Sequence, residues 1–128
     1  EFFIVNTHMD AGRRNSDRSS RKKQLEHIVS TISQRTTTEA LIVAGDLNLH
    51  SENPEDVKLL ENFKKELKLT DAFTGHKISE KWTILDYFLY RQGEEVEFKI
   101  NSAGEDKSFV TEEGHLSDHP ALFIEISI

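Results

Sequence analysis

The most informative segment of this chain is Ala40-Leu41-Ile42-Val43-Ala44-Gly45-Asp46-Leu47-Asn48. Its apolar first half predicts a buried strand, and Gly45 lets the backbone bend where that strand ends. If the extended geometry persists through Leu47, Asp46 and Asn48 leave on one face while Leu47 points into the core. That face then carries a carboxylate and a carboxamide, hard oxygen donors suited to Mg²⁺ or Mn²⁺. The alternative is that both residues are simple turn formers.

Three other short motifs place polar side chains within an apolar run or at its end: Asn6-Thr7-His8, Leu85-Asp86-Tyr87 and Ser117-Asp118-His119-Pro120. The run over residues 2–7 shows little alternation and predicts a strand covered on both faces, with His8 at its end. Asp86 interrupts a predicted strand over residues 83–91, so its carboxylate needs a partner inside the fold. Polar groups that follow several strands in this way indicate a shared site.

The segments between the motifs predict two helices. After a polar surface loop over residues 9–20, a first helix is capped by Ser19 or Ser20, or begins earlier near Asp17. A second helix begins at Asn53-Pro54, a good N-cap followed by a residue that suits the first turn. Each helix has an apolar stripe at helical spacing: Leu25, Ile28, Val29 and Ile32 in the first, and Val57, Leu60, Phe63 and Leu67 in the second.

The order strand, helix, strand in the first part of the chain implies a right-handed parallel crossover, which brings the ends of both strands to one sheet edge. Residues 95–100 alternate and predict an antiparallel or edge strand, and residues 121–128 predict the last strand. Residues 74–81 are expected to form a loop, and residues 101–115 a polar, mobile segment. The fold class is therefore α/β.

Composition bounds the class of protein. With 36% hydrophobic and 30% charged residues, the 128-residue chain is typical of a globular protein of one domain at most. The absence of cysteine excludes disulfides and zinc–thiolate sites and leaves the compartment open. The net charge of −7 argues against generic polyanion binding, although residues 13–23 hold six basic residues and one acid. That run is either a basic loop that holds an anionic substrate or a solvated surface.

A few aromatic and histidine side chains have plain structural readings. His27 is expected on the helix surface, and His50 in a loop close to the motif around Asp46. Trp82 is expected to anchor a loop by packing against it. Tyr87 and Tyr90 should point to opposite faces of their strand because their spacing is odd.

Taken together, the four motifs resemble the endonuclease/exonuclease/phosphatase superfamily, the fold shared by DNase I, apurinic endonucleases, neutral sphingomyelinases and inositol polyphosphate 5-phosphatases. They occur in the family's order over nearly the whole chain, and Arg21-x-x-Gln24 adds a weaker match. Thr83-Ile84 departs from the arginine or serine of many nucleases, which argues against an apurinic endonuclease. The Thr7-His8-Met9-Asp10-Ala11-Gly12 run is closer to sphingomyelinase-like and uncharacterised bacterial members. The resemblance implies an αββα sandwich.

The resemblance also implies an activity and a role for each motif residue. The activity is a Mg²⁺-dependent (or Mn²⁺-dependent) phosphodiesterase or phosphatase. In it, Asp46 orients and deprotonates the attacking water, Asn48 holds that water or the phosphate, and His8 contacts the scissile phosphate. Asp86 accepts a hydrogen bond from His119 and fixes its tautomer.

The implied metal site and partners follow the same comparison. Asp118 contributes to the metal site directly or through water, together with Asp46 and Asn48. The expected substrate is a phosphate ester: nucleic acid, phospholipid or inositol phosphate. The alternative is a non-catalytic binding or scaffold domain that keeps the fold.

The family order places two further metal ligands, a glutamate and an asparagine, upstream of His8. We therefore expect residues 1–128 to be the C-terminal portion of a single domain, with its N-terminal half absent. This portion should be half of the four-layer sandwich, one mixed β-sheet with flanking helices, and inactive alone. Its inner sheet face would be bare, and either the missing half or an oligomer would cover it.

Overall fold

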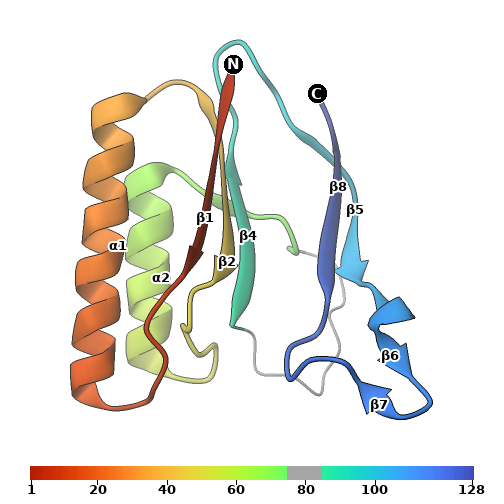
Figure 1. Ribbon diagram of the computed structural model, residues 1–128. Coiled ribbons are helices and arrows are strands. Elements are labelled where there is room, and N and C mark those ends of the chain that lie inside the picture. The colour runs from red at the N-terminus through yellow and green to blue at the C-terminus, as the bar shows by residue number, and fades with distance from the viewer. Residues whose placement is uncertain (75–84) are drawn as a thin grey trace.

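The computed structural model of the chain describes residues 1–74 and 85–128 (Figure 1). In chain order its elements are β1 (Phe2–His8), α1 (Asn15–Arg35), β2 (Ala40–Asp46), α2 (Pro54–Leu67), β3 (Thr70–Asp71), β4 (Asp86–Arg91), β5 (Lys99–Glu105), the short 3₁₀ helix η1 (Lys107–Phe109), β6 (Val110–Thr111), β7 (Gly114–His115) and β8 (Leu122–Ser127). Neither helix of this described part has the length and apolar character needed to cross a membrane.

Four strands form a mixed sheet in the order β1-β2-β4-β3. β2 lies inside it, parallel to β1 and antiparallel to β4, and is buried from Ala40 to Ala44, as its apolar run predicted. β1 has the predicted position, but the prediction that both its faces are covered is wrong. It is an edge strand with alternating exposure, and Ile4 is 64% exposed. An apolar run alone does not distinguish an edge strand from a central one.

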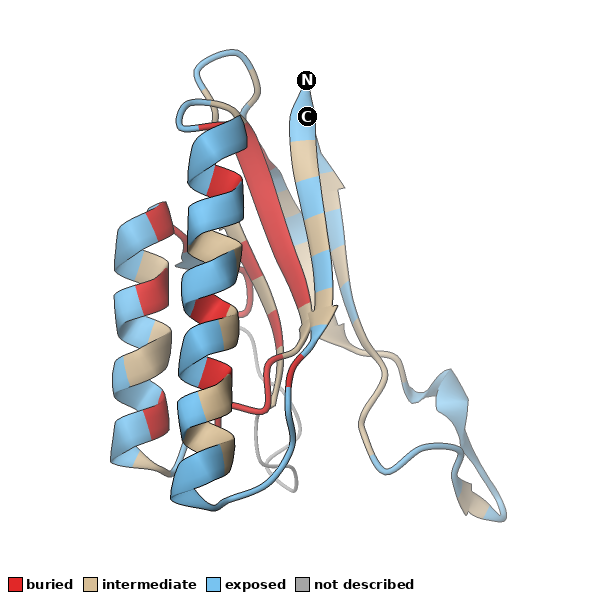
Figure 2. Ribbon diagram, turned by 60° about the vertical axis from the view of Figure 1, so that its left-hand side comes forward, coloured by how far each residue is buried: buried red, intermediate tan, exposed pale blue. Residues whose placement is uncertain are grey.

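Both helices cover the same face of this sheet (Figures 1 and 2). The core between them combines residues of α1, α2, β2 and β4: Leu25, Ile32, Leu41, Val43, Phe63, Leu67 and Leu89. α2 begins after Asn53, whose side chain accepts hydrogen bonds from the Glu55 and Asp56 amides, as predicted. Val57, however, which was predicted to belong to the apolar stripe of α2, is 38% exposed, and the neighbouring Asp56 is buried instead.

α1 begins several residues earlier than the serine caps predicted. Asn15 is its first residue, so much of the expected loop over residues 9–20 is helical. The side chain of Asp17 accepts a hydrogen bond from the backbone amide of Arg14, 2.9 Å away. A carboxylate in the first turn also interacts favourably with the helix dipole, which supports the alternative start near Asp17.

A second, two-stranded sheet lies on the opposite face of the four-stranded sheet (Figure 2). It pairs β5 with β8 in antiparallel fashion, and Phe98 packs with Ala40, Ile42 and Ala44 between the sheets. β8 confirms the predicted last strand. β5 begins only at Lys99 and continues to Glu105, into the segment expected to be polar and mobile, which also holds η1, β6 and β7. Pairing with β8 orders residues whose own composition gives no strand signal.

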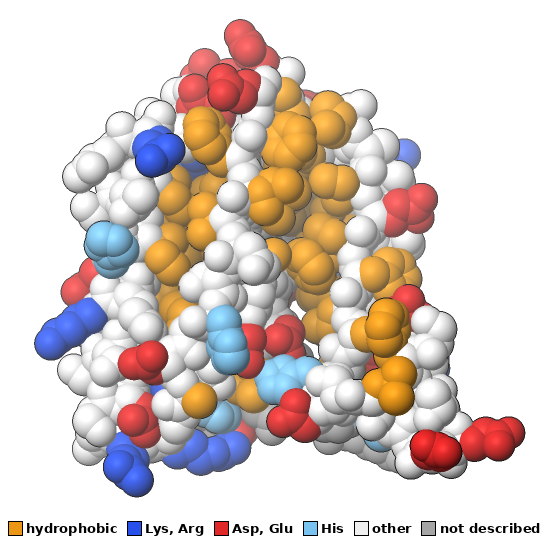
Figure 3. All heavy atoms as spheres, viewed as in Figure 1, with side chains coloured by type: hydrophobic (Ala, Val, Ile, Leu, Met, Phe, Trp, Pro, Cys, Tyr) orange, Lys and Arg blue, Asp and Glu red, His pale blue; other side chains and the backbone are white. Residues whose placement is uncertain are grey.

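The layers are therefore helices, a mixed sheet and a small second sheet, which confirms the α/β class and half of a DNase I-like sandwich. The inner face is covered only in part. Figure 3 shows hydrophobic side chains gathered between β1 and β8, and Phe2 and Ile4 on β1 are exposed. Trp82, most of the predicted loop over residues 74–81 and the start of the strand predicted from residue 83 lie outside the described residues.

Candidate active site

Three of the candidate residues form a row across neighbouring strand ends. The β1–β2 register places His8 opposite Asp46, and the β2–β4 register places Asp46 opposite Asp86. Residues directly opposite one another in a sheet have side chains on the same face. Strand pairing by itself therefore sets one imidazole and two carboxylates side by side.

His119 joins this row from the loop that precedes β8. Its Nδ1 lies 2.6 Å from Asp86 Oδ2, and its Nε2 lies 3.7 Å from Asp46 Oδ2. On the other side, His8 Nε2 lies 3.4 Å from the same Asp46 oxygen. The Asp46 side chain is 16% exposed, whereas that of His8 is 75% exposed. Asp46 thus lies between two imidazoles, one held by a hydrogen bond and one open to solvent.

The surroundings of His119 favour its cationic form. The hydrogen bond to Asp86 raises the pKa of His119 above its usual value of 6.5. Burial lowers that pKa, but the negative charges of Asp86, Asp46 and Asp118 add to the increase. With Nδ1 on Asp86, Nε2 is left to donate a hydrogen bond towards Asp46 or an anionic ligand.

Gly45 is required where the row meets the β1–β2 pair. Its φ of +137° belongs to the region that favours glycine, and a Cβ added there would lie 1.9 Å from the backbone oxygen of Thr7. A side chain at this position would push β1 away from β2. The glycine therefore keeps His8 and Asp46 in register.

Asn48 does not continue the extended geometry. β2 ends at Asp46, and Asn48 has a left-handed φ of 50° while Leu47 is fully buried. The backbone amide of Asn48 donates to Asp46 Oδ1 at 2.9 Å, and its Nδ2 donates to the Met9 carbonyl at 2.7 Å. The turn thus brings Asn48 back beside Asp46. Its carboxamide is anchored through nitrogen, so only its oxygen is left to serve as a metal ligand.

The acidic and histidine groups that lie close enough to share a cation include one residue of the predicted set, Asp46. Ligand atoms of Asp46, Asp86 and His119 lie within 4.8 Å of one another, the one such cluster of acidic and histidine groups within residues 1–74 and 85–128. Asp118 is exposed and does not belong to it. Two carboxylates suit Mg²⁺ or Mn²⁺, but an octahedral ion needs more oxygen ligands than this cluster offers. The residues present fit one side of a divalent-cation site.

Sequence reasoning missed a buried ionic cluster behind the row. His50 lies in a loop, as predicted, and is buried there with Nδ1 3.0 Å from Asp56 Oδ2. Arg18 and Arg21, from the run read as a basic loop or solvated surface, contact the same carboxylate from α1. Of this cluster, only the Arg21-x-x-Gln24 pattern gave a sequence signal. Two of the six cations are therefore held by Asp56, and Arg13 and Lys22 also form ion pairs, with Glu52 and Glu26.

The remaining aromatic and histidine readings have mixed outcomes. His27 is exposed on α1, as predicted. Tyr87 is buried and donates its hydroxyl hydrogen to the Leu49 carbonyl at 2.7 Å, and burial raises its pKa. Tyr90 packs against the other core cluster, between the two sheets, which fits the predicted opposite faces. Tyr87 thus fixes the turn that carries Asn48.

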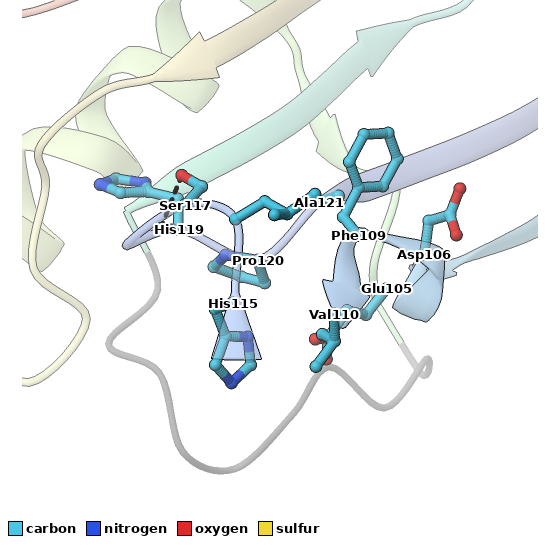
Figure 4. Close-up of a pocket in the computed structure, with 10 residues that line it drawn as sticks. Glu105, Asp106, Phe109, Val110, His115, Ser117, His119, Pro120 and Ala121 are labelled. Atoms are coloured by element: carbon cyan, nitrogen blue, oxygen red, sulfur yellow. Dashed lines mark hydrogen bonds between the residues drawn. The ribbon is translucent and has the colours of Figure 1, made fainter. Parts of the chain in front are cut away.

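A cavity of about 260 Å³ lies behind His119, between the β5–β8 sheet and the β6–β7 hairpin (Figure 4). Phe109, Val110, Pro120 and Ala121 contribute to its wall. In Figure 4 the imidazole of His119 points away from these residues. The His119 ring therefore contacts Asp86 and Asp46 at the strand ends, and the cavity lies on the other side of the loop that carries His119.

Comparison with known proteins shows the fold. No family model matches the chain, and no curated protein matches it in sequence. Three solved structures are similar at TM-scores of 0.68, 0.68 and 0.56: D. rerio TDP2 complexed with single-strand DNA product, an endonuclease/exonuclease/phosphatase family protein from Bacteroides thetaiotaomicron, and sphingomyelinase C from Streptomyces griseocarneus.

The three matches have 15%, 14% and 15% sequence identity and cover 98%, 96% and 95% of this chain. They cover 56%, 47% and 48% of the matched chains, so this chain spans about half the length of each. At this identity the likeness establishes the fold, which is the DNase I-like fold that the four motifs resemble.

Proposed function

We propose that this chain, which has the endonuclease/exonuclease/phosphatase fold, is part of a metal-dependent phosphodiesterase or phosphatase. The observation that carries the proposal is the row His8, Asp46 and Asp86, with His119 bonded to Asp86 and directed at Asp46. Phosphoester cleavage needs a group that accepts a proton from water and cationic donors for the phosphoryl oxygens. This row supports both requirements at one edge of a rigid sheet.

In the proposed reaction each group has a distinct task. Asp46 accepts a proton from the attacking water. Its carboxylate lies between the imidazoles of His8 and His119, which are hydrogen-bond donors on either side. His119, whose pKa is raised by the hydrogen bond to Asp86, donates from Nε2 to a phosphoryl or leaving-group oxygen. His8 is exposed enough to contact the bound phosphate directly. Asn48 orients the water through its carboxamide oxygen, which accepts a hydrogen bond, or the phosphate through the Nδ2 proton that is not bonded to Met9.

The proposed cofactor is Mg²⁺ or Mn²⁺, which would neutralise charge on the phosphoryl oxygens when bound. Asp46 and the Asn48 oxygen are the proposed ligands, with Asp118 acting through water because it lies outside the cluster. The proximity of Asp86 to Asp46 adds negative charge to the site. Asp86 itself is occupied by His119, which argues for a supporting role rather than direct coordination.

The substrate is proposed as a phosphate ester, with nucleic acid and phospholipid as the leading classes and inositol phosphate as a third. The similar structures include one with a single-strand DNA product and one named as a sphingomyelinase. The structural likeness does not separate these classes, because both proteins match over nearly all of this chain.

We further propose that residues 1–128 form the C-terminal portion of one larger domain. The matched structures are about twice as long as this chain, and its inner face exposes Phe2 and Ile4. A missing N-terminal half would cover that face and supply the additional metal ligands. An oligomer is the other way to cover it. On this proposal, activity belongs to the complete domain and not to this portion alone.

The test uses the full-length protein with bis-p-nitrophenyl phosphate as substrate. Hydrolysis should stop with EDTA and return with added Mg²⁺ or Mn²⁺, while residues 1–128 alone should be inactive. Nucleic acid, phospholipid and inositol phosphate are then compared as natural substrates. Full-length protein that hydrolyses none of these with either metal would refute the proposal.

The position of Asp118 supports a second candidate, a non-catalytic domain that keeps the fold for binding. Asp118 is exposed and lies outside the described cation cluster, as expected if metal binding were no longer needed. In that case Asp46→Ala and His119→Ala would leave every measurable function of the full-length protein unchanged. Loss of hydrolysis in either variant would exclude this candidate.

A further inference from the structure

Arg21 is an unusually placed cation. It lies on α1, its side chain is fully buried, and its Nη1 donates to the carbonyls of Asp10 and Gly12 at 3.0 and 2.8 Å. Both carbonyls belong to the loop that follows β1 and His8. Burial of a guanidinium is costly unless hydrogen bonds and an opposite charge compensate for it. Here the compensation comes from a loop of the candidate site and from one carboxylate, that of Asp56.

Asp56 is the counterpart of Arg21 on α2. Its side chain is 1% exposed, and its Oδ1 lies 3.5 Å from Arg21 Nη2. Its Oδ2 accepts a hydrogen bond from the backbone amide of His50 at 3.1 Å and lies 3.0 Å from His50 Nδ1. His50 belongs to the loop that follows β2 and carries Asn48. Asp56 therefore holds the second loop of the candidate site as Arg21 holds the first.

Asp56 remains charged in this position. Burial raises its pKa, but the hydrogen bonds from His50 and Arg18 and the charge of Arg21 outweigh burial, so the pKa lies below its usual value. The link between the two loops is thus an ion pair under ordinary conditions.

The two loops also meet directly beside the row. The Met9 amide donates to the Asp46 carbonyl at 2.9 Å, and Asn48 Nδ2 donates to the Met9 carbonyl at 2.7 Å. Met9 is adjacent to His8 in sequence. A shift of either loop therefore changes the position of Asn48 relative to His8, and Arg21 with Asp56 restrains both loops from behind.

We infer that Arg21 and Asp56 are positioning residues for the proposed hydrolysis. They touch no reacting atom, and they act by fixing the distance between His8 and Asn48. The inference rests on the proposed function. Arginine is needed at position 21 because its planar fork serves two carbonyls and a carboxylate at once, whereas lysine offers a single ammonium group.

The test compares Arg21→Lys with Arg18→Met in the full-length protein. Arg18 contacts the same Asp56 carboxylate at 3.0 Å, but its other described contacts are to Glu55 and Asn15, not to either loop. Arg21→Lys should lower kcat with bis-p-nitrophenyl phosphate roughly 10- to 100-fold with KM changed less than about threefold, because small misplacements of catalytic groups reduce kcat. Arg18→Met should leave kcat within about twofold.

A second readout needs no activity. The Asn48 side-chain amide protons should exchange with solvent about tenfold faster in Arg21→Lys than in Arg18→Met, since loosening of the loops breaks the bond to Met9. NMR measures this exchange directly. If Arg21→Lys does not fold, Asp56→Asn replaces it, because this variant keeps the size of the side chain and removes its charge.

Equal kcat values and equal Asn48 exchange rates in the Arg21 and Arg18 variants would overturn the inference. A parallel loss of thermal stability in both variants without the kcat difference would show a merely structural role and also overturn it. If wild-type protein hydrolyses no phosphoester, the proposed function fails instead. The exchange measurement then still decides whether the pair restrains the two loops.

Discussion

The strand-borne residues of the candidate site and its loop-borne histidine are positioned in different ways. His8, Asp46 and Asp86 are aligned by strand register, so backbone hydrogen bonds over whole strands fix their relative positions. His119 comes from the loop before β8 and reaches the row through its 2.6 Å contact with Asp86. The strand-borne residues are placed by the fold, whereas the loop-borne histidine depends on one side-chain contact.

This difference indicates where the site tolerates change. A strand-borne residue can be replaced by a residue of equal size without moving its neighbours, so a loss of activity reports on its chemistry. A change at the Asp86–His119 contact moves a whole group, so a loss of activity reports on geometry and charge together. Four substitutions in the full-length protein separate these effects.

Asp46→Asn tests the strand-borne half and should have the largest effect. The variant keeps the shape of the side chain but cannot accept the proton from water, so kcat should fall about 10³-fold. Initial rates with bis-p-nitrophenyl phosphate measure the loss. Asp106→Asn, which alters a half-buried carboxylate at the N-cap of η1, is the control and should retain activity. A tenfold loss or less in Asp46→Asn would exclude Asp46 as the base.

His119→Ala removes the loop-borne group and should lower kcat by about 10²-fold, the typical contribution of one acid or base. The effect should be smaller than that of Asp46→Asn because His8 remains as a donor to the phosphate. His27→Ala, on the exposed surface of α1, controls for the loss of a histidine. Activity equal to that of the control would remove His119 from the mechanism.

Asp86→Asn weakens the contact between the strand-borne Asp86 and the loop-borne His119 and should lower kcat about tenfold. The pKa of His119 is raised chiefly by the hydrogen bond to Asp86, so His119 loses its proton only as the pH rises through that raised value. Activity that needs protonated His119 is therefore lost on the alkaline side of the pH–activity profile. In Asp86→Asn this alkaline limb should move to lower pH, towards 6.5.

The measurement for Asp86→Asn is kcat/KM as a function of pH for wild type and variant. His119→Ala serves as the reference, because the alkaline limb assigned to His119 should be missing from the pH profile of this variant. An alkaline limb that stays in place in Asp86→Asn would mean that another group sets it.

Asp118→Asn should have the smallest effect. The side chain is exposed and contributes to the row mainly through its charge near His119, so kcat should change less than about fivefold. If Asp118 acts on the metal through water, the Mg²⁺ concentration for half-maximal activity should rise severalfold. Glu113→Gln on the nearby β6–β7 turn is the control. A loss as large as that of Asp46→Asn would make Asp118 a direct metal ligand.

Local sequence patterns predicted a large share of the fold. β2, the start of α2 at Asn53 and the last strand, β8, follow from apolar runs and capping residues that act within a few positions. The contact between His119 and Asp86 was expected through the family resemblance of the motifs, and its catalytic meaning stays a prediction. The strands and the helix start share a local cause, because neighbouring residues specify them, whereas the His119–Asp86 contact joins residues 33 apart.

Other features needed the assembled chain. The exposure of β1 depends on its place at the sheet edge, and β5 depends on pairing with β8 across 17 or more positions. The buried contact between Arg21 and Asp56 joins residues 35 apart in sequence, and composition gave the opposite reading of Arg21 as a surface charge. Such contacts leave no periodic pattern in the sequence.

Hydrophobic periodicity and turn residues are local properties, so they identified which polar residues lie at the ends of which strands. That His8, Asp46 and Asp86 form one row depends on strand order and register, which bring them together only in the folded chain. The fold also determines that Asn48 turns back beside Asp46 and that buried charges restrain the loops behind them. Long-range pairing and the burial of charge are settled only when the whole chain packs.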